Sequence, residues 1–173
     1  MLKFNLSIVA LSVLASSAAL AHVTLENQQA VIGSTYKATF RMPHGCEGKA
    51  TNVVRVQVPT GFTGVKAMPK PGWKLEMVKD TSGPAKKDDH GADIVIIKEV
   101  VWSGGNLLDE NYDEFVFRGS LSKDLTANTT LYFPVVQECG DKATERWIEI
   151  PADGKTSADY KKPAPGLKLL PKP

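Results

Sequence analysis

The chain has few of the residues and none of the short motifs that mark the common enzyme active sites. Its 173 residues include only three histidines and two cysteines. It has no glycine-rich phosphate loop, no HExxH zinc motif and no GxSxG nucleophile elbow. Nucleotide-binding enzymes, zinc proteases of this type and serine hydrolases therefore have no support in the sequence, and we expect a protein that is not an enzyme.

The charge balance argues against nucleic acid as a partner, and the short apolar run argues against a membrane span. The chain has 21 Lys and Arg against 19 Asp and Glu, a formal net charge of +2. Nucleic-acid binding requires a concentrated excess of positive charge, so we expect no such partner. The apolar run at 6–14 is too short for a spanning helix and no second run follows, so we expect no membrane span in the mature chain.

Residues 1–21 have the features of a cleavable signal peptide. Lys3 gives a positive start, residues 6–14 form a short apolar segment, and Ala19 and Ala21 are the small residues that precede a cleavage site. The mature protein would then begin at His22, have a net charge of about +1 because only Lys3 is lost, and be exported to the periplasm or the outside of the cell.

The two cysteines, Cys46 and Cys139, are far apart in the sequence. In an exported chain this pattern predicts one disulfide, which the chain-entropy model values at roughly 4 to 5 kcal/mol. A thiolate site for copper(I) is the alternative, but the chain lacks a CxxC spacing and a methionine-rich stretch.

Alternating apolar and polar residues, separated by turn residues such as Pro69-Lys70-Pro71-Gly72, predict an all-β fold of short strands. Amphipathic sheets bury their apolar faces against each other, so we expect a two-sheet immunoglobulin-like sandwich over residues 22–151. Residues 152–173 are rich in Pro and Lys and read as a C-terminal tail with room for one late strand. The expected strands are 22–26, 34–42, 51–58, 72–78, 93–102, 112–119, 129–136 and 145–150.

His22 is the most informative residue because cleavage would make it the first residue of the mature chain. A terminal histidine has two nitrogen donors, the α-amine and ring Nδ1, which can close a chelate ring on one metal ion. An α-amine and an imidazole are both weak bases, so a bound metal ion can displace their protons at neutral pH. Copper(II) binds such nitrogen donors most tightly among the divalent ions.

A stable site needs a further ligand, and three side chains are candidates for a role beside the metal. Glu26 is four residues from His22, about 13 Å in an extended strand at about 3.3 Å per residue, so it is an outer participant at most. Glu114 is on the strand face opposite to that of Phe115, which we assign to the core. Glu114 is therefore either a solvated residue or a ligand. In 145–150 we expect Ile148 and Ile150 to be buried and Trp147 to lie toward the sheet edge.

These residues together resemble the YcnI-like family of exported copper-binding domains. The resemblance rests on the start at 22–25, the turn at 69–73, the segments 102–105 and 112–115, and Trp147 in the last strand. It implies a sandwich that binds one copper(II) through a single-histidine brace for copper homeostasis, storage or delivery. His22 would supply two nitrogens, Glu114 an oxygen, and Trp147 would pack beside the metal; other exported copper-handling proteins would be partners.

Other classes stay open. Copper-dependent oxidative enzymes also use a terminal histidine, but they add a second one, which here would have to be His44 or His90. A CopC-like carrier would need further histidine and acidic ligands. An immunoglobulin-like adhesion or assembly module would bind no metal and would expose a large apolar or edge-strand surface.

Overall fold

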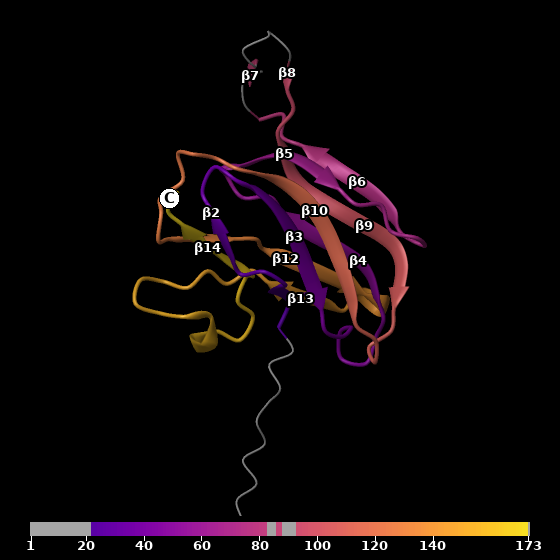
Figure 1. The fold of residues 1–173 in the computed structure, drawn as a ribbon. Helices are drawn as coiled ribbons and strands as arrows, with labels where there is room; N and C mark the ends of the chain where they lie inside the picture. The colour runs from indigo at the N-terminus through magenta and orange to yellow at the C-terminus, as the bar shows by residue number, and fades with distance from the viewer. Residues whose placement is uncertain (1–21, 83–85, 88–92, 173) are drawn as a thin grey trace, which may run out of the picture.

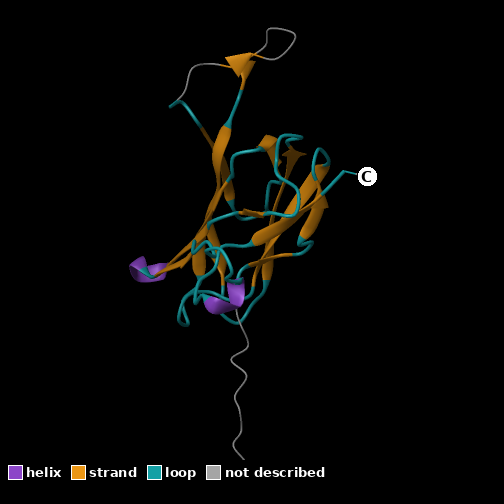
Figure 2. Ribbon diagram, turned by 90° about the vertical axis from the view of Figure 1, so that its left-hand side faces the viewer, coloured by secondary structure: helices purple, strands orange, loops and turns teal. Residues whose placement is uncertain are grey.

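Two antiparallel sheets packed face to face form the body of the protein (Figure 1, Figure 2). The structure is a computed structural model that describes residues 22–82, 86–87 and 93–172. The predicted signal peptide, residues 1–21, and His90 lie outside the described residues.

The first sheet has the strand order β1-β3-β10-β5, and the second has the order β13-β12-β4-β9-β6. The strands of the first sheet are β1 (Thr24–Leu25), β3 (Thr35–Met42), β10 (Asp113–Leu121) and β5 (Phe62–Ala67). The strands of the second sheet are β13 (Thr144–Trp147), β12 (Val135–Cys139), β4 (Thr51–Gln57), β9 (Ile97–Leu107) and β6 (Lys74–Lys79).

A third, smaller sheet has the order β11-β14-β2 and lies along one side of the sandwich (Figure 1). Its central strand β14 pairs in antiparallel fashion with β11 and in parallel with β2. The remaining elements are a short hairpin and two single-turn helices. The bounds of these elements are β2 (Gln29–Val31), β11 (Thr130–Tyr132), β14 (Gly166–Leu170), β7 (Lys86–Lys87), β8 (Asp93–Ile94), η1 (Gly140–Lys142) and η2 (Ser157–Asp159).

The core between the sheets is built from the inward side chains of the alternating strands. Phe40 and Phe117 pack on each other at 5.2 Å between ring centroids, and both contact Phe133. All three rings are fully buried. The predicted all-β sandwich is confirmed, and Phe40 and Phe117 lie on the inward faces that alternation indicated for 34–42 and 112–119.

The predicted strand 129–136 is two strands in the structure. The expected segment 129–136 divides at Pro134, which has no N–H to donate to a ladder. Phe133 donates its N–H to the carbonyl of Pro165, while the carbonyl of Pro134 accepts from the N–H of Gln57. The chain therefore passes at this point from β11 in the small sheet to β12 in the second main sheet.

The expected C-terminal tail, residues 152–173, contributes the strand β14 to the folded body. Leu167 and Leu169 on β14 are buried in the core, and Lys168 between them is exposed. The allowed late strand is thus present, because the tertiary pairing of β14 with β2 and β11 makes this short alternating segment a core strand.

Candidate functional site

His22 lies two residues before the start of β1 and beside a tryptophan of the second sheet. Its ring centroid is 5.6 Å from that of Trp147, in an edge-to-face arrangement. Trp147 is on β13, the edge strand of the second sheet, and is only 4% exposed. The structure thus brings these two sequence-predicted residues into contact across the two sheets.

The expected faces of this strand were wrong. Trp147 is buried, whereas Ile148 and Ile150 are exposed. The regular strand ends at Trp147, and Glu149 beyond it forms only an isolated bridge with Pro163. The indole, and not the isoleucines, fills the space at the edge of the sandwich.

A buried glutamine fixes the orientation of the indole. The Nε1–H of Trp147 donates to Oε1 of Gln137 at 2.7 Å, and Gln137 is fully buried. The Nε2 of Gln137 donates in turn to the carbonyl of His44 at 3.0 Å and to the hydroxyl of Thr51 at 3.1 Å. Because these polar groups are paired inside the protein, the indole N–H points inward and the ring is held in one position beside His22.

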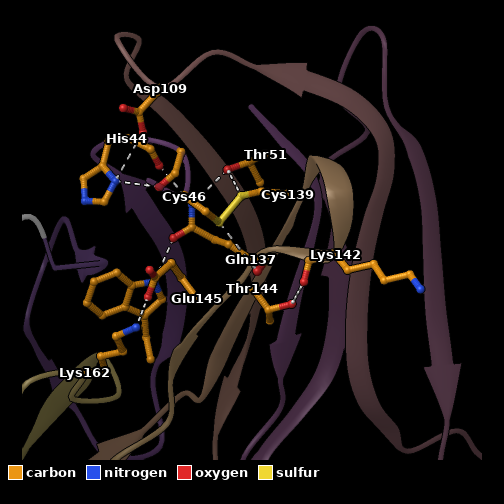
Figure 3. The surroundings of a disulfide bond; sticks show 12 residues. His44, Cys46, Thr51, Asp109, Gln137, Cys139, Lys142, Thr144, Glu145 and Lys162 are labelled. Atoms are coloured by element: carbon orange, nitrogen blue, oxygen red, sulfur yellow. Dashed lines mark hydrogen bonds and ion pairs between the residues drawn. A yellow bond between two sulfur atoms is a disulfide. The ribbon is translucent and has the colours of Figure 1, made fainter. Parts of the chain in front are cut away.

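The predicted disulfide closes the same end of the sandwich (Figure 3). Cys46, in the loop after β3, is bonded to Cys139 at the end of β12, with Cα atoms 6.0 Å apart. The bond joins the two sheets next to Thr51, whose hydroxyl is 3.5 Å from Sγ of Cys139. Both cysteines are used, so the alternative of a thiolate copper(I) site is not supported.

Glu114 lies on the outer face of the first sheet, where it is paired with a cation. Cross-strand register aligns Thr24, Arg41 and Glu114 on adjacent strands. Arg41 Nε is 3.7 Å from Glu114 Oε1, and the hydroxyl of Tyr112 also donates to that oxygen. The Glu114 side chain is 38% exposed, and in the described part of the chain it forms no ion pair with His22.

Arg41 also contacts the third predicted participant, Glu26, with Nη2 3.4 Å from its Oε1. Desolvation, followed by its hydrogen bond to Glu114, raises the pKa of the neighbouring Tyr112 to about 12. Two carboxylates therefore share one arginine, and each must loosen its contact with that arginine before it can bind another cation.

Glu145 is a carboxylate that the sequence reasoning missed. It is two residues before Trp147 on β13, so both side chains point to the same face, and it pairs in register with Gln137. The side chain is 12% exposed, and its Oε2 forms an ion pair with Nζ of Lys162 (Figure 3). This oxygen is buried and accepts no hydrogen bond of regular geometry within the described residues. Placing Trp147 inward would have placed Glu145 inward as well.

His44 does not join His22. Its Nδ1 is 2.6 Å from the carbonyl of Gly45 and 3.8 Å from Oδ1 of Asp109. Within the described residues, no three or more His, Cys, Asp or Glu side chains gather so that they could hold a metal ion.

Comparison with known proteins identifies a family and supports the fold. A family model described as a domain of unknown function, DUF1775, matches residues 22–169. The chain is similar to an uncharacterized protein from Nocardia farcinica whose crystal structure has an immunoglobulin-like fold, with 24% identity and a TM-score of 0.63 over 87% of this chain and 99% of that chain. This likeness confirms the predicted immunoglobulin-like sandwich.

A weaker structural likeness, to the sixth cohesin of scaffoldin B from Acetivibrio cellulolyticus, has a TM-score of 0.39 and 7% identity over 86% of this chain and 97% of that chain. A search of curated proteins finds no significant match. Among the described residues, no helix has the length and apolar character needed to cross a membrane.

Proposed function

From the membership of this chain in the DUF1775 family and its resemblance to YcnI-like domains, we propose that the processed protein binds one copper(II) ion through His22 and serves copper homeostasis, storage or delivery outside the cytoplasm. The proposed role is binding without catalysis. The observation that carries the proposal is the contact of His22, the first residue after the predicted cleavage site, with the fixed ring of Trp147.

Processing creates the metal-binding group. In the full-length chain the backbone nitrogen of His22 is an amide bonded to Ala21, and it becomes a free amine only when residues 1–21 are removed. The amine and ring Nδ1 then offer two nitrogens from one residue, the kind of donor that copper(II) prefers. The donor set lacks thiolate and thioether groups, which favours oxidised over reduced copper.

A carboxylate completes the proposed set. The resemblance assigns this role to Glu114, which must exchange its contact with Arg41 for the metal. Glu145 is the carboxylate that the structure adds to the candidates, because it shares a strand face with Trp147 and is largely buried. Either oxygen donor would neutralise half of the charge of copper(II).

Trp147 acts beside the metal and not as a strong ligand. An indole nitrogen only donates a hydrogen bond, and here it donates to Gln137. The ring itself excludes water from one side of His22, and its π-face attracts cations.

Export is part of the proposal. The disulfide between Cys46 and Cys139 is typical of oxidising compartments such as the periplasm or the cell exterior. We propose that the protein exchanges copper there with other exported copper-handling proteins.

The test compares two forms of the mature protein in copper(II) titrations. One begins at His22, and the other has a single alanine ahead of it. The extension converts the amine of His22 to an amide, so we expect affinity to fall by at least about a hundredfold, with loss of amine-nitrogen coupling in the paramagnetic resonance spectrum. Thermal unfolding of both metal-free forms is the control for folding. Equal affinity of the two forms would refute the brace.

A further inference from the structure

A groove opens beside His22 on the side of the molecule formed by the small sheet. Its volume is about 430 Å³. Residues of β1, β2, β11 and β14 line it, together with residues of the loop that carries η2. His22 is a lining residue, so a ligand in the groove would lie next to the proposed metal-binding nitrogens.

The groove is positively charged. Lys168 on β14 and Lys155 in the loop both line it, and its lining includes no Asp or Glu. Both lysines are exposed, and neither ammonium forms an ion pair within the described part of the chain. Hydroxyl groups of Thr130 and Ser157 add neutral hydrogen-bonding capacity. Carboxylate groups are the complementary ligand chemistry, since charge-assisted bonds to ammonium groups are strong.

Part of the groove is formed where two side chains of β11 pack over a glycine of β14. Gly166 on β14 pairs with Tyr132, and a Cβ at Gly166 would lie 2.8 Å from Cγ2 of Thr130 and 3.1 Å from the Tyr132 ring. The absence of a side chain at Gly166 therefore leaves room for the side chains of Thr130 and Tyr132, which line the groove with it.

The volume of the groove and its position next to His22 limit the size and kind of ligand that it can bind. A volume of about 430 Å³ is at the lower end of small-molecule sites, roughly 300–1,000 Å³. We infer that the groove binds a small polycarboxylate, and that copper(II) reaches His22 as the complex of such a chelator. The second part rests on the proposed function. Transfer is a ligand exchange in which copper–carboxylate bonds break and copper–nitrogen bonds to His22 form, with no change of oxidation state.

The first experiment uses citrate and the metal-free mature protein, followed by amide chemical shifts. We expect saturable shifts at groove residues, and at least about tenfold weaker binding in Lys155→Glu and in Lys168→Glu. Lys161→Glu is the matched control, because Lys161 is exposed in the same loop but does not line the groove. The alanine-extended protein should still bind citrate, so a failure of the copper brace would not be mistaken for a failure of the groove.

Two results would overturn the inference. One is citrate binding that is absent or insensitive to the charge at both lysines. The other is competition by sulfate as effective as that of citrate itself, which would indicate general attraction of anions in place of a polycarboxylate site.

The second experiment mixes copper(II)–citrate with the mature protein and follows transfer by stopped-flow absorbance. Transfer at least tenfold slower in the Lys155→Glu, Lys168→Glu double variant than in Lys161→Glu supports delivery through the groove. Equal transfer rates would refute it.

Discussion

Replacing Gln137 by methionine should destabilise the protein by about 2–4 kcal/mol, although the two side chains have similar length. Gln137 is fully buried and makes three side-chain hydrogen bonds, at 2.7, 3.0 and 3.1 Å. Methionine keeps most of the packing volume but offers neither the acceptor nor the donor. The change therefore isolates the polar contribution of this position.

The largest loss is at Trp147. Its Nε1–H is buried, and without Gln137 it becomes an unpaired donor, which costs about 1–3 kcal/mol. The carbonyl of His44 and the hydroxyl of Thr51 lose one donor each, although Thr51 keeps its contact with Cys139. Each of these losses costs less than the first, and the greater apolarity of methionine offsets part of them, which gives the stated range.

Urea unfolding of the disulfide-bonded protein measures this prediction. Gln57→Met is the matched control, because Gln57 is exposed at the end of β4, and its change should stay within about 0.5 kcal/mol. In Gln137→Met the indole N–H resonance of Trp147 should also move toward the position of a free donor. A destabilisation below about 1 kcal/mol, or one equal to that of Gln57→Met, would refute the assigned network.

Two further predictions concern the ligands and the crosslink. Copper(II) titrations of Glu114→Gln and Glu145→Gln should show which carboxylate binds the metal. The variant that removes the ligand should lose at least about tenfold in affinity, and the other should stay within about twofold. Unchanged affinity in both variants would exclude both carboxylates as ligands. Replacing Cys46 and Cys139 together by alanine should lower the free energy of unfolding by up to about 4–5 kcal/mol, since the bond spans a sequence separation of 93; reduced wild-type protein is the control, and a loss below about 1 kcal/mol would contradict the entropic estimate.

Local alternation was enough to predict the strands that fill the core. The segments 34–42, 51–58 and 112–119 match β3, β4 and β10 within two residues at each end. By contrast, β5 (Phe62–Ala67) was missed because Gly64, at a φ of 61°, and a register shift opposite it interrupt the pattern. Short or irregular strands are defined by their partners, which a local pattern does not contain.

In the candidate site too, local features could be predicted from the sequence and features that depend on strand partners could not. The position of His22 after a cleavage signal is a local feature and was read from the sequence. The pairing of Glu114 with Arg41 depends on the register of β3 and β10, and the inward position of Glu145 depends on which face of β13 is buried. Both are tertiary facts, and they decide which carboxylate is available to a metal.

The disulfide and the tryptophan are linked through one buried network. Gln137 joins the Trp147 indole to the carbonyl of His44, two residues before Cys46, and to Thr51, which contacts Cys139. Under the proposed function, two events in an oxidising compartment therefore act on the same end of the sandwich. Cleavage frees the amine of His22, and oxidation secures the loop and strand that hold the partners of Gln137. A reduced or unprocessed chain lacks one of these two conditions, which favours copper binding only after export.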